Sequence, residues 1–99
     1  KKILTDEEMI AYKSSTLKEN FLAKRFAAKE AFSKAMGTGF RGEINLQAIS
    51  VKHDEMGKPS FDFNNNINEI LIKQKITCQH LSISDEKNIA VAFVILDKS

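Results

Sequence analysis

Residues 25–39, RFAAKEAFSKAMGTG, hold the side chains whose types and spacing could do chemistry. A helix turns by about 100° per residue, so Glu30, Ser33 and Lys34 would share one polar sector. The glycine-containing segment 37–39 would follow one turn later. A carboxylate beside an ammonium group, next to a glycine loop, is the arrangement expected of a site for a metal ion and a phosphate.

Simpler explanations remain open for these residues. Glu30 and Lys34 could form an i,i+4 ion pair worth about 0.2–0.5 kcal/mol, and Gly37 could be only a helix C-cap.

Arg25 and Lys29 would occupy an adjoining sector of the same helix. The alanines between these groups would let another backbone or a ligand approach closely; they are Ala27, Ala28, Ala31 and Ala35.

Two predicted helices would position these groups, over residues 5–13 and 17–36. Thr5 and Glu8 form the pattern of a capping box at the start of the first helix. Residues 14–16, Ser-Ser-Thr, predict a break and a new N-cap for the second. Its apolar stripe is Leu17, Phe21, Ala28, Phe32 and Ala35, widened by Leu22, Ala31 and Met36.

The second half of the chain predicts strands and one short helix. We expect strands over residues 46–52, 60–63, 76–84 and 89–96, and a helix from the Asn64–Asn66 cluster to about Lys73. The last two strands read as an antiparallel hairpin. Residues 90–96 are apolar enough to predict burial on both faces, and Cys78 is expected to be a small buried thiol. This order of elements favours an α+β fold.

Composition limits the class of protein. Ninety-nine residues with 42% hydrophobic and 28% charged residues predict one globular domain, residues 1–99. A net charge of +2 is too small to argue for nucleic acid, and no apolar run or leader pattern predicts a membrane segment or a secreted protein. Cys78 is the only cysteine, which excludes an internal disulfide. We therefore expect a cytoplasmic location.

Four segments in order resemble the holo-acyl-carrier-protein synthase family, the short trimeric bacterial type within the 4′-phosphopantetheinyl transferase superfamily. Residues 25–39 are similar to the family's signature, and ILTDEE at residues 3–8 is similar to its "vLT-x-x-E" helix start. DEMGKP at residues 54–59 resembles the "n-d-x-x-G-K-P" turn. HLSIS at residues 80–84, followed by AVA at 90–92, resembles the hairpin "H-x-S-x-S … A-x-A".

The resemblance implies a fold with an antiparallel sheet packed against a long helix. It also implies transfer of the 4′-phosphopantetheine group from coenzyme A to a serine of apo-acyl carrier protein, with release of 3′,5′-ADP, in fatty acid biosynthesis. Glu30 matches the family's metal ligand, usually for Mg²⁺, and Lys34 a catalytic lysine. The residues matching the coenzyme A contacts are Arg25, Lys34, Gly37, Gly39 and Pro59. The family works as a homotrimer with active sites between subunits.

Other positions leave alternatives open. Lys29 could contact the cofactor or form a structural salt bridge, and His80 could be functional or a hydrogen-bonded structural histidine. Asp85 stands where many members have a second histidine, and a carboxylate there would repel phosphate unless a metal ion or water intervened. The family's other metal carboxylate, in a "G-I-G-x-D" strand, would precede Lys1, so we expect an N-terminal piece and part of the docking helix to be missing.

That gap keeps a second class of function open, a catalytically inactive domain that binds coenzyme A or a carrier protein. A third, nucleic-acid binding through the basic residues between Lys24 and Lys34, is weaker. The nearby aromatic residues belong mainly to the apolar stripe, so they are not available for stacking on bases.

Overall fold

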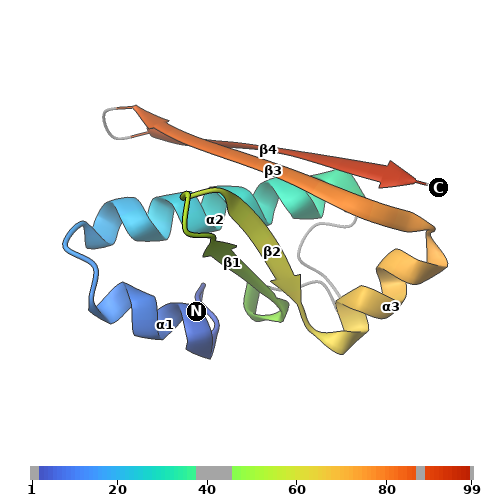
Figure 1. Ribbon diagram of the computed structural model, residues 1–99, viewed down its shortest axis with the longest axis horizontal. Coiled ribbons are helices and arrows are strands. Elements are labelled where there is room, and N and C mark those ends of the chain that lie inside the picture. The colour runs from blue at the N-terminus through green and yellow to red at the C-terminus, as the bar shows by residue number, and fades with distance from the viewer. Residues whose placement is uncertain (1–2, 38–45, 87–88, 99) are drawn as a thin grey trace.

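The computed structural model describes residues 3–37, 46–86 and 89–98. The elements are α1 (Asp6–Lys13), α2 (Lys18–Met36), a 3-10 turn (Leu46–Ala48), β1 (Ile49–His53), β2 (Pro59–Phe63), α3 (Asn65–Lys73), β3 (Ile76–Glu86) and β4 (Ile89–Lys98). Within the described ranges the strands form two antiparallel pairs, β1–β2 and β3–β4. The β3–β4 hairpin lies along one side of α2, and the other elements lie on the opposite side (Figure 1). The α+β fold with a sheet against a long helix is confirmed.

The predicted capping box at α1 is confirmed. The Glu8 amide donates to Thr5 Oγ1 at 3.2 Å, and the Thr5 amide donates to Glu8 Oε1 at 3.0 Å. These two bonds satisfy amide groups that the first turn of a helix leaves without partners. Thr5 Oγ1 also lies 2.8 Å from Ser50 Oγ, so the same cap attaches α1 to β1.

The predicted N-cap of α2 is wrong by one residue. Leu17, not Thr16, takes the N-cap position, and no side chain caps the helix there. Ser15 Oγ accepts instead from the Leu17 amide at 3.2 Å, and Lys18 Nζ donates to the Ser15 carbonyl at 2.8 Å. The Ser-Ser-Thr segment therefore forms a connection after α1 that is held by these two hydrogen bonds and not by a side-chain cap.

The first predicted strand begins later than expected. Residues Leu46–Ala48 form a 3-10 turn, and β1 starts at Ile49. The register pairs Ile49 with Phe63 and His53 with Pro59. Ser50 is buried, as are the apolar residues on either side of it. The alternation of buried and exposed residues that the sequence predicts for this strand is therefore absent from its first residues. These residues contact α1 and α2 as well as β2.

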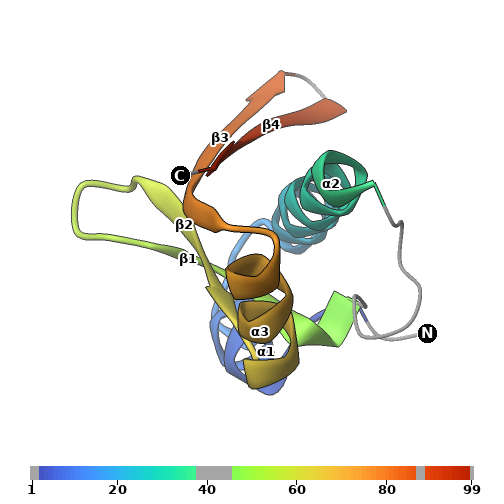
Figure 2. The ribbon, with the colours of Figure 1, turned by 90° about the vertical axis from the view of Figure 1, so that its right-hand side faces the viewer.

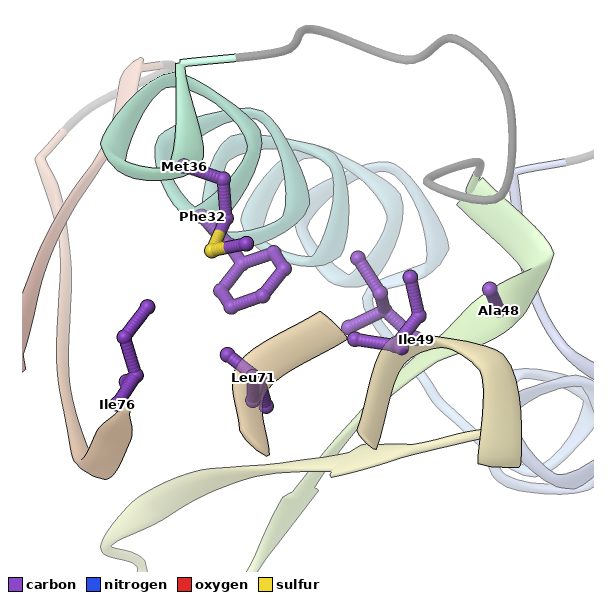
Figure 3. Close-up of a cluster of buried hydrophobic side chains, with 7 residues drawn as sticks. Phe32, Met36, Ala48, Ile49, Leu71 and Ile76 are labelled. Carbon is purple, nitrogen blue, oxygen red and sulfur yellow. The ribbon is translucent and has the colours of Figure 1, made fainter. Parts of the chain in front are cut away.

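One apolar core lies between α2, α3 and the strands. Phe32 and Met36 of α2 point toward Ile49 and toward Leu71 of α3, with Ile76 closing one side (Figure 3). The Phe32 ring packs against those of Phe61 and Phe63, with centroids 5.3 and 4.9 Å away. The remaining buried members of the cluster are Ala48 and Ile67. The expected α3 is also confirmed, with Asn64 as its N-cap.

The β4 strand is covered on one face only, so the predicted burial on both faces is wrong for this chain. Its half-buried residues face α2, and its exposed residues alternate with them. Figure 2 shows the hairpin packed on α2 with its other face uncovered by the described elements. The bare face carries Ile89, Val91, Phe93 and Ile95, with Phe93 67% exposed. A continuous apolar run in a strand indicates that both faces of the strand are to be covered. It does not indicate whether the second face is covered by the same chain or by another molecule.

Candidate phosphate and metal site on helix α2

Glu30 and Lys34 lie one turn apart in the C-terminal half of α2, as predicted. Glu30 is half-buried and Lys34 is exposed. Among the described residues no ion pair joins them, although both belong to the described part of α2. Four residues of helix bring them within about 40° of one face. Both charged groups therefore face the same region, and neither forms an ion pair with the other.

Gly37 ends α2 at the edge of this region. It has a left-handed backbone, φ 80°, and its amide donates to the carbonyls of Ser33 and Lys34. A Cβ built on Gly37 would meet nothing within 4 Å, so glycine is required here by the backbone angle and not by crowding. The C-cap explanation is confirmed, and a contact with a nucleotide stays a prediction. Gly39 lies outside the described residues.

Within a single chain, Arg25 does not lie where its predicted contact with coenzyme A would require it. Its side chain is buried, with Nε 3.6 Å from Glu8 Oε2 and the guanidinium 4.0 Å from the centroid of the Phe21 ring. Burial lowers the pKa of Arg25, and the negative charge of Glu8 opposes that shift. An arginine stays protonated in proteins. Arg25 therefore keeps its positive charge on the face of α2 that contacts Glu8.

Lys29 forms a structural ion pair, one of the two alternatives left open by the sequence. It has no exposed surface, and its Nζ donates to Glu8 Oε1 at 2.6 Å. It also donates to the carbonyls of Ile3 at 2.7 Å and Leu46 at 2.8 Å. Burial lowers the pKa of Lys29, and the hydrogen bond that Lys29 donates to Glu8 opposes this shift. With its ammonium bonded to these acceptors, Lys29 is not accessible to a ligand.

Glu8 is the residue that sequence reasoning did not connect with α2. Besides Lys29 and the α1 cap, its Oε2 accepts from the Val51 amide at 2.7 Å. One carboxylate thus joins α1, α2 and β1. A signal was present, because Arg25, Lys29 and Ser33 fall at the helical spacing of the buried Ala28, Phe32 and Met36. Charges that share the core-facing stripe of a helix require a buried partner.

Arg25 and Lys34 cannot meet one ligand phosphate from the same chain. Nine residues separate them, a rise of about 14 Å and a rotation of about 180° along a helix. Pro59, another predicted contact, pairs with His53. The charges of Arg25 and Lys24 reach His53, where they add to burial in lowering its pKa. Arg25 and Pro59 are thus linked only through His53, and Glu30 and Lys34 share one turn of α2 on another part of the helix.

The two residues of the hairpin motif that were left open now have partners. His80 Nε2 lies 2.8 Å from Asp97 Oδ2 on the exposed face. Asp85 accepts from Asn20 Nδ2 at 2.6 Å and lies 3.9 Å from Lys24 Nζ, so it attaches the hairpin to the first half of α2. Neither residue lies in the turn that holds Glu30 and Lys34. Cys78, predicted to be buried, is exposed, because the bare face of the hairpin includes it.

Two open hollows lie in the described surface. One of about 590 Å³ lies between the start of α2 and the start of β4, and one of about 320 Å³ lies beside Leu4 and Tyr12. Neither is lined by Glu30 or Lys34. Glu30 is half-buried and Lys34 is exposed on α2, outside these two hollows. None of the described helices has the length and apolar character needed to cross a membrane.

The long α2, the antiparallel hairpin and the Glu30–Lys34 turn define a class of protein. A sequence model of the 4′-phosphopantetheinyl transferase superfamily matches residues 1–94. The holo-[acyl-carrier-protein] synthase of Nitrosospira multiformis is 52% identical over 98 residues, which cover 99% of this chain and 78% of that protein. The chain thus belongs to the holo-[acyl-carrier-protein] synthases of this superfamily.

Solved structures agree with this assignment. The crystal structure of the Neisseria meningitidis holo-[acyl-carrier-protein] synthase matches with a TM-score of 0.93 and 45% identity, covering 97% of this chain and 77% of that one. The enzyme of Bacillus anthracis, in complex with CoA (3′,5′-ADP), matches with a TM-score of 0.82 and 39% identity, covering 100% and 79%. These matches cover both halves of the chain.

Proposed function

We propose that this chain carries out its family's reaction at a composite site, built from the Glu30–Lys34 turn of one subunit and the Arg25–Pro59 region of another. The reaction moves the 4′-phosphopantetheine group from coenzyme A to a serine of apo-acyl carrier protein, and 3′,5′-ADP leaves. The observation that carries the proposal is the placement of Glu30 and Lys34, two opposite charges on one accessible face of α2 with no mutual ion pair in the described ranges.

Glu30 suits a magnesium ion. Mg²⁺ prefers oxygen ligands and usually keeps several waters beside one or two carboxylates, and a half-buried carboxylate on a rigid helix leaves room for those waters. When bound, the ion would neutralise charge on the pyrophosphate oxygens. The resemblance implies a second carboxylate upstream of Lys1, and that ligand stays a prediction.

Lys34 would contact the phosphates as a compact positive charge. It is exposed and one turn from Glu30, so its ammonium can reach the same group. As charge moves to the leaving nucleotide, a positioned ammonium lowers the barrier more than it strengthens ground-state binding. The left-handed Gly37 ends α2 three residues after Lys34. Phosphoryl transfer depends mainly on such positioning and charge neutralisation.

A homotrimer would bring the two groups of residues together. The support is geometric: Arg25 and Lys34 lie on opposite sides of α2, and β4 exposes a stripe of Ile89, Val91, Phe93 and Ile95. Apolar patches of this kind are uncommon on proteins that remain monomeric. A partner subunit covering the stripe would remove it from water. We also expect the enzyme to work in the cytoplasm, beside its acyl carrier protein.

Replacing Glu30 tests the site. The Glu30→Gln variant should lose at least about 100-fold in Mg²⁺-dependent transfer, because the amide keeps the shape but not the charge that holds the ion. Mass spectrometry of apo-acyl carrier protein incubated with coenzyme A measures the gain of one phosphopantetheine. Glu69→Gln, an exposed carboxylate on α3, is the matched control and should transfer normally. Wild-type rates for Glu30→Gln would overturn the metal assignment.

The same assay separates the enzyme from the alternative of a binding module. An enzyme produces the mass gain, whereas a module that only binds coenzyme A or the carrier protein produces a complex without it. A chain that binds both partners and never increases the carrier mass would reject the transfer function. The assay is made on this chain, which spans 78% of the Nitrosospira relative.

Replacing Phe93 tests the homotrimer. Phe93→Asp places a charge in the middle of the bare β4 stripe, where Phe93 is 67% exposed in the single chain, so the fold should survive and the assembly should not. Sedimentation velocity should report a trimer for the wild type and smaller species for the variant. Met56→Asp, on the exposed β1–β2 turn, is the control. A wild-type protein that remains monomeric at micromolar concentration would contradict the composite site.

A further inference from the structure

A second group of possible metal ligands lies on the bare face of the hairpin, away from Glu30. Cys78 Sγ, a ring nitrogen of His80 and a carboxylate oxygen of Asp97 all lie within 4.8 Å of one another, and all three side chains are exposed. It is the one such group of three found among the described residues. We propose that these residues form a site for a thiolate-binding divalent cation of the Zn²⁺ type, at the Ile95 end of the stripe that the proposed trimer would cover.

The backbone of the hairpin brings the three ligands together. Cys78 and His80 are two residues apart on β3, so their side chains leave the same face of the strand. Asp97 on β4 is the register partner of Cys78. The register shifts between Ile76 and Cys78, and a bulge of this kind changes which residues stand opposite each other. The Cys78–Asp97 pair keeps the register of the rest of the hairpin, and only the Ile76–Lys98 pair beyond it is shifted.

Two of the ligands already have a defined mutual orientation. His80 Nε2 and Asp97 Oδ2 are 2.8 Å apart, which holds the imidazole over the partner strand beside Cys78. Bonds of about 2.0–2.3 Å in a tetrahedral site put neighbouring ligand atoms about 3.4–3.7 Å apart. The separations in the structure, 4.8 Å or less, require only rotation of exposed side chains. The cation would replace the His80–Asp97 hydrogen bond.

The ligand types select the metal. A thiolate and an imidazole favour Zn²⁺, Co²⁺ and related ions over Mg²⁺, which takes oxygen ligands. Three protein ligands leave the fourth position of a tetrahedral ion open to water or to a group from another molecule. The site is therefore chemically distinct from the Glu30 site, and a cell's magnesium would not compete for it.

Cobalt titration of the reduced full chain is the direct test. Co²⁺ bound to a thiolate gives a ligand-to-metal charge-transfer absorption, and we expect it to saturate at one equivalent per chain. Cys78→Ser should abolish the band. His80→Gln and Asp97→Asn should each weaken binding by at least about tenfold, the scale on which lost ligand support weakens metal sites. Zn²⁺ should displace Co²⁺, and excess Mg²⁺ should not.

The second histidine provides a matched control. The chain has two histidines, and His53 is exposed on the other hairpin, so His53→Gln should bind Co²⁺ like the wild type. Far-UV circular dichroism confirms that each variant is folded. A missing band in the wild type would overturn the proposal, as would a band that persists unchanged in both His80→Gln and Asp97→Asn, since a lone thiol would then be the whole site. Equal weakening by His53→Gln would also reject it.

Discussion

The two faces of α2 use the same residue types for opposite purposes. On the inner face Lys29 donates to Glu8 and to two backbone carbonyls, and it has no contact with water. On the outer face, one residue further along, Glu30 and Lys34 are accessible and are not joined by an ion pair in the described ranges. A rotation of about 100° separates a structural charge pair from a candidate catalytic one.

The difference teaches how to recognise which charges are available for a ligand. Glu8 has at least four polar neighbours, the amides of Thr5 and Val51 and the side chains of Lys29 and Arg25. Its geometry is fixed before any ligand arrives. Lys34 has retained the freedom to move onto a phosphate. The basic stretch that the sequence presents as one cluster is thus divided by the fold into a scaffold and a site.

The largest expected effect comes from breaking the inner pair. Lys29→Met keeps most of the side-chain volume but leaves the Glu8 carboxylate buried without its closest cation. Removing one member of a buried ion pair typically costs about 3–5 kcal/mol. Urea unfolding at a fixed chain concentration measures the loss in the free energy of unfolding.

A double variant is the control for Lys29→Met. Glu8→Gln combined with Lys29→Met removes both charges, so it should recover part of the lost stability, since no uncompensated charge remains. If Lys29→Met unfolds at the wild-type urea concentration, the inner face does not depend on this pair and the contrast between the two faces fails.

An intermediate effect is expected on the outer face, and it should appear in activity alone. Lys34→Ala should change the free energy of unfolding by less than about 0.5 kcal/mol, as is usual for exposed positions. Losing a charge-assisted hydrogen bond costs about 1.5–3 kcal/mol, or about 10- to 150-fold in kcat/KM for coenzyme A. Lys18→Ala, exposed at the other end of α2, should leave kcat/KM unchanged. Equal kinetics for both variants would remove Lys34 from the site.

The smallest effect concerns His53, which senses the charges of α2. His53 is exposed but partly shielded from water, and this partial burial, followed by the charges of Arg25 and Lys24, lowers its pKa below 6.5. The unfolded chain therefore binds the proton first as pH falls. The contribution of His53 to stability is complete above about pH 6.5 and is lost as pH falls through the lower pKa of the folded state. His53→Gln should lose less stability than the wild type between pH 7 and pH 5. Parallel losses in the two proteins would contradict this linkage.

Much of the local structure could be predicted from the sequence because it depends on neighbouring residues. The Thr5–Glu8 cap, the Gly37 terminus, the Asn64 cap and the final hairpin were all predicted from short-range patterns, and all are present. The family assignment also followed from ordered motifs. The helix turn with Glu30 and Lys34 needed no tertiary information, since helical spacing alone puts residues i and i+4 on one face.

Tertiary structure decided which of these groups face protein and which face water. Whether Lys29 was a ligand contact or a structural cation depended on Glu8, 21 residues away in the sequence, and spacing within a helix carries no information about such a distant partner. The exposure of Cys78 and of the β4 stripe depended in the same way on how the hairpin packs on α2. Local pattern determines the directions in which side chains leave the backbone, and packing between distant segments determines what each of them meets.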